Sequence, residues 1–173
     1  MKLIETKFKE IKIFCPEIIR DERGYFFESY NLKKFNQGVH FVQDNESQSK
    51  HGVLRGLHYQ KKPFGQSKLV RVIKGNIQDV VVDIRPESQT YKQYLSIELN
   101  DENKYQLLIP DGFAHGFLVL SDEAIVSYKV DNHYSKEFDA GYRYNDPSLD
   151  IKWLIDETNI ILSDKDKNLP FLK

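Results

Sequence analysis

The segment "VLRGLHYQ", residues 53–60, places an arginine and a histidine inside a run that otherwise has the character of a buried strand. On a regular strand His58 faces the same side as Leu54 and Gly56, whereas Arg55 points to the other side. A β-bulge at Gly56 is expected to break this alternation and bring Arg55 and His58 together. Because imidazole titrates near neutral pH, His58 is a candidate general base. The alternative is a core histidine hydrogen-bonded within the protein, with Arg55 at a strand end.

A second stretch, "IPDGFAHGF" at 109–117, sets His115 just after a tight turn that enters a strand. Together with "GLHYQ" and "KLVRVIKG", it resembles the two signature stretches of the cupin superfamily, whose members are jelly-roll barrels. Metal-binding cupins carry His-x-His and a glutamate in the first stretch and a further histidine in the second. Here Gln60 and Lys68 occupy two of those four ligand positions. Since a protonated lysine has no lone pair and repels cations, we expect no metal and no other cofactor.

A fixed cation beside a histidine suits a reaction in which a base removes a proton and an oxyanion forms. Abstraction of a proton α to a carbonyl is such a reaction, with His58 as the base. Lys68, together with Arg55, would then hold the enolate oxygen. The alternative for Lys68 is a solvated strand residue next to the glycine turn at Gly75.

Short runs of alternating apolar and polar residues must position these side chains, and they indicate an all-β fold. "KLVRVIKGNIQDVVVDIR" predicts two strands divided at 74–76, and further strands are expected at 94–99, 105–110, 116–121 and 124–130. Such spacing is typical of a sandwich or small barrel. The only helical signals are a short helix around 29–35 and a C-terminal turn that begins near Ser163. We therefore expect a single cupin-like jelly-roll domain over residues 1–173.

Composition excludes several classes of function. The net charge is −1, and no run of five or more basic residues appears, so no nucleic-acid partner is expected. No stretch approaches the length of a membrane span, and the N-terminus lacks the apolar centre of a signal peptide. The single Cys15 cannot form an internal disulfide, which favours a cytoplasmic location.

Nearly the whole chain resembles one family, the dTDP-4-dehydrorhamnose 3,5-epimerases. The ordered matches are "DERGYFFESY", "FVQDN", "VLRGLHYQ", "KLVRVIKG", "VVVDIR", "IPDGFAHGF", "SYKV", "YNDPSLDIKW" and "SDKD". The resemblance implies a metal-free isomerase of carbohydrate biosynthesis that inverts C3 and C5 of a 4-keto-6-deoxy sugar carried on a nucleoside diphosphate. It also implies a homodimer that exchanges its N-terminal strand.

The same resemblance assigns roles to individual residues. His58 would be the base, Asp166 its orienting carboxylate, and Tyr128 the acid that returns a proton from the opposite face. Lys68 and Arg55 would hold the carbonyl oxygen and a nearby phosphate or hydroxyl. The remaining substrate contacts that the resemblance implies are His115 in the same pocket, Arg23 and Glu28 from the partner subunit, and Gln43, Asn45, Asp139 and Lys165.

Each of these residues also has a purely structural alternative. Tyr128 fits a strand tyrosine at the barrel rim, and Asp166 fits the solvated first turn of a helix capped by Ser163. Arg23 and Glu28 fit a surface ion pair, and Gln43 and Asn45 fit loop capping groups.

The function also leaves alternatives open at this point. They are a C3-only epimerase or a ketoisomerase of the same family, an epimerase acting on a 4-keto heptose, and a cupin that binds nucleotide sugars without catalysis. A metal-dependent oxygenase is disfavoured by Gln60 and Lys68. The nucleotide base, the exact sugar and the number of inverted carbons are not fixed by the sequence.

Overall fold

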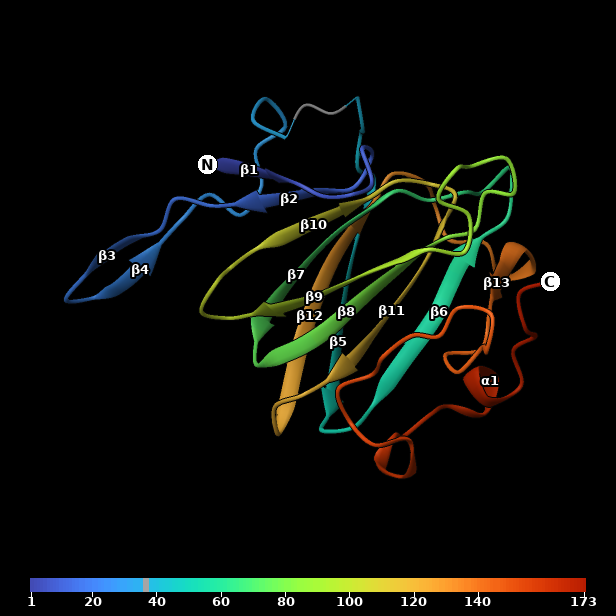
Figure 1. Cartoon of the computed structure of the whole chain (residues 1–173). Helices are drawn as coiled ribbons and strands as arrows, with labels where there is room; N and C mark the ends of the chain where they lie inside the picture. Colours follow the sequence, from blue (N-terminus) through green and yellow to red (C-terminus); the bar gives the residue numbers. More distant parts are fainter. Residues whose placement is uncertain (36–37) are drawn as a thin grey trace.

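The computed structural model describes residues 1–35 and 38–173, and within them two antiparallel sheets pack face to face (Figure 1). One sheet has the order β1-β2-β10-β7-β12-β5, the other has the order β13-β6-β11-β8-β9, and β3 and β4 form a separate hairpin. The strands are β1 (Lys2–Glu5), β2 (Lys12–Cys15), β3 (Ile19–Asp21), β4 (Gly24–Phe26), β5 (Gln43–Lys50), β6 (Leu54–Gln60), β7 (Lys68–Lys74), β8 (Asn76–Asp83), β9 (Tyr94–Asn100), β10 (Gln106–Ile109), β11 (Phe113–Val119), β12 (Glu123–Val130) and β13 (Asp139–Gly141). Two 3₁₀ turns, Lys136–Phe138 and Glu157–Asn159, and one short helix, α1 (Asp164–Lys167), complete the described elements.

The hydrophobic core fills the space between the two sheets. It includes Val70 and Val72 from β7, Ile77 and Val81 from β8, and Phe117 from β11, all of them buried. Because strand side chains alternate, every second residue of these strands faces the interior of the barrel. The all-β, cupin-like jelly roll expected from the sequence is confirmed.

The predicted strands are largely confirmed, and one helix prediction is wrong. The division at 74–76 separates β7 from β8, and β9, β10 and β12 match the predicted runs within one residue at each end. β11 begins at Phe113, three residues earlier than expected. The helix predicted around 29–35 is instead a single turn, in which the Asn31 carbonyl accepts from Lys34 N and Phe35 N. One turn fixes several dihedral angles for few hydrogen bonds, so it does not propagate.

β6 contains the bulge that the sequence predicts at Gly56. In its pairing with β11, His58 lies opposite His115 and Arg55 lies opposite Phe117, so β6 carries one extra residue between the two pairs. Gly56 has φ +138°, and a Cβ built on it would lie 2.5 Å from the Cα of Gly116. Only glycine satisfies both conditions, so this position fixes the change of alternation beside the histidine.

The C-terminal segment is attached to the same strand. Ile161 N donates to Gly52 O at 2.8 Å, and Leu54 N donates to Ile161 O at 3.0 Å. α1 follows at once, and its N-cap Ser163 accepts a hydrogen bond from Asp166 N at 3.1 Å. This cap confirms the predicted C-terminal turn. It places α1, which carries Asp166, beside β6, a strand about a hundred residues earlier in the chain (Figure 1).

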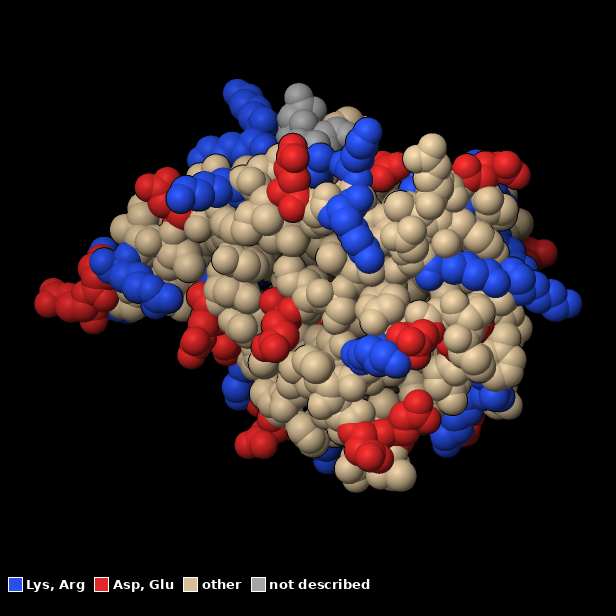
Figure 2. All heavy atoms as spheres, in the orientation of Figure 1, with Lys and Arg blue, Asp and Glu red and all other residues tan. Residues whose placement is uncertain are grey.

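The hairpin β3–β4 extends away from the barrel (Figure 1). Ile19 and Phe26 on it are 59% and 65% exposed, which is unusual for large apolar side chains. On the face shown in Figure 2, acidic and basic side chains are interspersed and no large area of one sign appears. In the described residues, no helix has the length and apolar character needed to cross a membrane.

Candidate active site

Two adjoining cavities open inside and at the rim of the barrel, with volumes of about 530 and 310 Å³. They share His58, Lys68, Tyr128 and Lys165 as lining residues, so they form one continuous site. The larger cavity is also lined by Arg55, His115 and Asp166, and the smaller one by Gln43, Asn45 and Asp139. The structure therefore brings together all the site residues predicted from the sequence except Arg23 and Glu28.

His58 and Asp166 form a hydrogen-bonded pair. His58 Nε2 lies 2.5 Å from Asp166 Oδ1, and the carboxylate side chain is only 4% exposed. Burial alone would raise the pKa of Asp166, but hydrogen bonds from His58 and from Ser163, with the charges of His58 and Lys165, hold that pKa below its usual value. The ionised Asp166 holds the imidazole through Nε2, so the other ring nitrogen is available for a proton transfer.

Lys68 projects from the facing sheet into both cavities. It lies on the inward face of β7 with Val70 and Val72, and its Nζ is 3.5 Å from the His58 carbonyl oxygen. Part of the side chain remains accessible from the cavity, but the barrel removes its ammonium group from bulk water. This burial lowers the pKa of Lys68 to about 8, against the attraction of Asp79 and Asp139. The ammonium group is therefore a cation in a poorly solvated site, where it stabilises a developing oxyanion most effectively.

Tyr128 lies on β12, in the sheet that faces the one carrying His58. It pairs with Val70 of β7 and with Asn45 of β5, and its side chain lines both cavities. Burial raises the pKa of the Tyr128 phenol, while the nearby Arg55 opposes that shift. The phenol is thus kept in its protonated form at neutral pH. A base on one sheet and a proton donor on the other can act on the two faces of a ligand between them.

The smaller cavity is the more polar end of the site. Gln43 Nε2 donates to Asn45 Oδ1 at 2.8 Å, and both side chains face inward from β5. On the other wall Asp139 Oδ2 accepts hydrogen bonds from Lys165 Nζ at 2.5 Å and from Tyr134 at 3.0 Å. These amides and the ammonium group of Lys165 can bind a polar, anionic extension of a ligand that sits in the larger cavity.

Gln60 and Lys68, which the resemblance places at ligand positions of metal-binding cupins, make other contacts here. Gln60 is buried and its Oε1 accepts from Ser135 N at 3.0 Å. Within the described residues, no cluster of three or more His, Cys, Asp or Glu side chains has the arrangement of a metal site.

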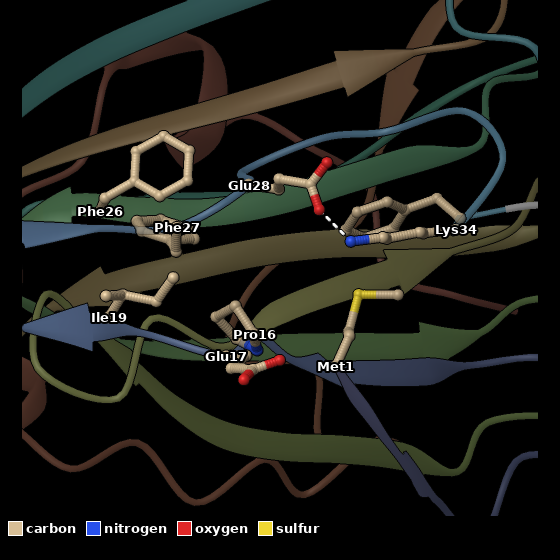
Figure 3. A pocket seen from close by; sticks show the side chains of 9 residues that line it. Met1, Pro16, Glu17, Ile19, Phe26, Phe27, Glu28 and Lys34 are labelled. Carbon is tan, nitrogen blue, oxygen red and sulfur yellow. Dashed lines mark hydrogen bonds and ion pairs between the residues drawn. The ribbon is translucent and has the colours of Figure 1, made fainter.

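Arg23 and Glu28 lie outside the site of their own chain. Arg23 is paired with Asp21 at the tip of the β3–β4 hairpin, at an N–O distance of 2.5 Å. Glu28 pairs with Lys34 and lines a separate cavity of about 200 Å³ near the N-terminus, together with Ile19, Phe26 and Phe27 (Figure 3). One chain alone does not bring either residue to His58.

Sequence reasoning missed several residues of the site. One of them is Asp79 on β8, whose Oδ2 lies 2.8 Å from His115 Nε2 and so pairs with this histidine. The signal that could have found it is a carboxylate at an inward position of a strand between Ile77 and Val81. The larger cavity is also lined by Ser47, Val53, Leu54, Phe117, Ile161, Leu162 and Ser163, which as common strand and loop residues carry no such signal.

Known proteins resemble this chain over nearly all of its length. The family model described as dTDP-4-dehydrorhamnose 3,5-epimerase matches residues 5–173. A dTDP-4-dehydrorhamnose 3,5-epimerase from Shigella flexneri is 50% identical over 172 residues, which cover 97% of this chain and 94% of that protein. A dTDP-6-deoxy-D-glucose-3,5-epimerase from Legionella pneumophila, solved with dTDP-4-keto-L-rhamnose, is 45% identical with a TM-score of 0.95, covering 99% of this chain and 92% of the other. The Bacillus anthracis dTDP-4-dehydrorhamnose 3,5-epimerase, solved with TDP and PPi bound, is 47% identical with a TM-score of 0.95 and 99% coverage of both chains.

The jelly-roll barrel, with the polar cavity inside it, and the family match together define a cupin-type isomerase that acts on a sugar nucleotide. Within this class, the sequence matches over nearly the full length of the chain point to one family. The chain belongs to the dTDP-4-dehydrorhamnose 3,5-epimerases.

Proposed function

We propose that this enzyme inverts C3 and C5 of a 4-keto-6-deoxy sugar carried on dTDP. The observation that carries the proposal is one cavity lined by the His58–Asp166 pair, by Lys68 and by Tyr128. Proteins similar to this chain, including one solved with dTDP-4-keto-L-rhamnose, support dTDP as the nucleotide and both carbons as the reaction centres.

In the proposed mechanism, His58 removes the proton from a carbon next to the C4 ketone. The C–H electron pair forms the enolate and the negative charge moves to the C4 oxygen, where the Lys68 ammonium group stabilises it. Asp166 stabilises the imidazolium that forms. Tyr128 then donates its phenolic proton to the opposite face of the same carbon, and the enolate collapses back to the ketone. Before the second carbon reacts, the His58 imidazolium releases its proton to solvent and the phenolate recovers one from solvent.

The positions of C1 and C4 in a pyranose ring determine the orientation of the substrate in the proposed mechanism. C1, which carries the nucleotide, is across the ring from C4. With the C4 oxygen at Lys68, the diphosphate therefore extends toward the polar end of the site, where Gln43, Asn45 and Lys165 lie. Arg55 and His115 are left to bind sugar hydroxyls or the nearer phosphate in the larger cavity. Asp139 acts by holding Lys165.

A second copy of the chain is proposed to complete the nucleotide site. β1 is an edge strand with four exposed residues, and the hairpin that follows β2 exposes Ile19 and Phe26. An unpaired edge and an apolar hairpin on one N-terminal region favour pairing with another chain. A homodimer that exchanges this region would bring Arg23 and Glu28 to the partner's nucleotide.

The compartment is part of the proposal. The unpaired Cys15 is consistent with a reducing environment, so we propose that the enzyme acts in the cytoplasm.

Incubation in heavy water tests the proposed function. The purified protein is given 4-keto-6-deoxy sugars linked to dTDP, GDP and CDP, and a GDP-linked 4-keto heptose, and the products are followed by NMR and mass spectrometry. We expect deuterium at both C3 and C5 of the dTDP sugar, with inversion at both. Deuterium at C3 alone would identify a C3 epimerase, and absence of exchange on every substrate would contradict the proposal.

A further inference from the structure

The interior of the barrel contains a buried carboxylate that the proposed mechanism does not use. Asp79 lies on the inward face of β8 between Ile77 and Val81, both part of the hydrophobic core. Its side chain is 0% exposed. A carboxylate without water in such surroundings is costly unless other groups compensate its charge.

The described residues provide a hydrogen-bond partner for only one of the two carboxylate oxygens of Asp79. His115 Nε2 lies 2.8 Å from Asp79 Oδ2, and His115 itself is 8% exposed. Asp79 Oδ1 is buried and has no hydrogen-bond partner among residues 1–35 and 38–173. His115 therefore satisfies one oxygen of Asp79, and the remaining negative charge of the carboxylate acts on other groups inside the barrel.

Lys68 lies on the sheet opposite Asp79, and its side chain points into the same interior. It shares the inward face of β7 with Val70 and Val72, and it lines the same cavity as His115. Burial lowers the pKa of Lys68 to about 8, and the attraction of Asp79 is the largest effect that opposes burial. The other titratable or charged groups that face this part of the cavity are Arg55 and His58 on β6, His115 on β11, Tyr128 on β12, Asp139 on β13 and Lys165 and Asp166 on or beside α1.

We propose that Asp79 is a positioning residue whose charge keeps Lys68 in its ammonium form inside the barrel and whose hydrogen bond fixes the ring of His115. The proposal rests on the role given to Lys68 in the proposed function. Without the charge at position 79, burial would shift Lys68 toward the neutral amine. A neutral amine is a weak partner for an enolate oxygen, so the reaction would lose its stabilised intermediate over part of the working pH range.

Asp79→Asn tests this directly, because it removes the charge while keeping a side-chain oxygen for His115. The pKa of Lys68 is measured without substrate by NMR of isotope-labelled lysine, with Lys68→Arg to assign the signal. We expect Asp79→Asn to lower this pKa by about one unit or more. The alkaline limb of kcat/KM should move to lower pH by the same amount, a shift that a merely structural defect would not produce.

Asp83→Asn is the matched control. Asp83 lies on the same strand, its side chain is also 0% exposed, and its carboxylate binds Arg85, Ser88 and Thr90 away from the cavity. This variant should lower the stability and leave the pKa of Lys68 unchanged. An unchanged Lys68 pKa in Asp79→Asn, or an equal shift in both variants, would overturn the proposal.

Stability gives a second readout that needs no substrate. If the two charges interact, Lys68→Met and Asp79→Asn should be non-additive in the free energy of unfolding, and the double variant should be more stable than additivity predicts. This comparison applies even if Asp79→Asn alone folds poorly, since Lys68→Met should then improve its folding. Additive effects would overturn the proposal, whereas a wild-type protein inactive on every 4-keto sugar would overturn only the proposed function.

Discussion

At the scale of single residues, the site depends on keeping ionisable groups in defined forms inside an apolar barrel. Asp166 stays ionised because its hydrogen bonds outweigh its burial, and Tyr128 stays protonated because burial raises its pKa. The ammonium form of Lys68 is the least stabilised of these three states, because burial lowers the pKa of Lys68 to about 8. The shifts of Asp166 and Tyr128 favour the protonation states that the proposed mechanism requires, whereas Lys68 keeps its ammonium form at neutral pH because its pKa remains near 8.

In the proposed mechanism, Lys68 should set the alkaline limit of activity. That mechanism requires its ammonium form, and burial lowers the pKa of Lys68 to about 8, so kcat/KM should fall as the pH rises through that value. Lys68→Ala should reduce the rate by about 10²-fold or more, the scale of a lost oxyanion donor. A pH–rate profile of both proteins checks this. A wild-type profile that stays flat to pH 10, or an unaffected variant, would return Lys68 to a structural role.

At the scale of elements, strand prediction from sequence succeeds where apolar, β-branched residues are frequent. β7 and β8 are rich in Val and Ile on either side of the glycine turn at Gly75, and the predicted run differs from them only at its end, where β8 stops at Asp83, two residues early. β5 was not predicted as a strand, because its inward residues Gln43, Asn45 and Ser47 are polar and line the site. The strand follows the period of two, but its polar inward face hides that period from a hydrophobicity pattern.

The site itself could be predicted in its chemistry but not in its connections. Resemblance to the family indicated the histidine, the tyrosine and the lysine, and the structure places them around one site. The contact between His58 and Asp166 joins residues 108 apart in sequence, which local patterns cannot reveal. Asp79 was overlooked for a different reason: in isolation a single aspartate in a strand reads as an exposed residue.

The bulge in β6 is the element that turns Arg55 and His58 toward one cavity. Gly56→Ala should destabilise the protein by more than about 2 kcal/mol, since its Cβ would meet the Gly116 backbone in addition to the strain of a positive φ. Gly24→Ala is the control, because Gly24 has φ +126° with nothing within 4 Å of the added Cβ, and it should cost only about 1 kcal/mol. Urea denaturation measures both, and equal losses would mean that the close approach to β11 is unimportant.

At the scale of the whole molecule, the proposed dimer divides each nucleotide site between two chains. The hairpin that carries Arg23 extends from the barrel and lies apart from the cavity of its own chain (Figure 1). The exposed Ile19 and Phe26 beside it give the hairpin an apolar surface for a partner.

Subunit complementation tests this arrangement. Arg23→Ala and His58→Asn chains should each form weakly active or inactive homodimers. When they are refolded together in equal amounts, each mixed dimer contains one site with an intact His58 and an intact Arg23 from its partner. About a quarter of all sites should then regain full activity. If Arg23 serves its own chain, or if sedimentation shows only monomers, mixing will restore nothing.

In the proposed mechanism, His58 and Tyr128 exchange protons on opposite faces of the same sugar carbon. The most direct measurement is NMR of dTDP-4-keto-6-deoxyglucose incubated in heavy water with wild-type, His58→Asn and Tyr128→Phe proteins, all checked for folding. We expect no exchange with His58→Asn. With Tyr128→Phe we expect deuterium that returns to the original face and little inverted product. Inversion at the wild-type rate by either variant would contradict the proposed mechanism.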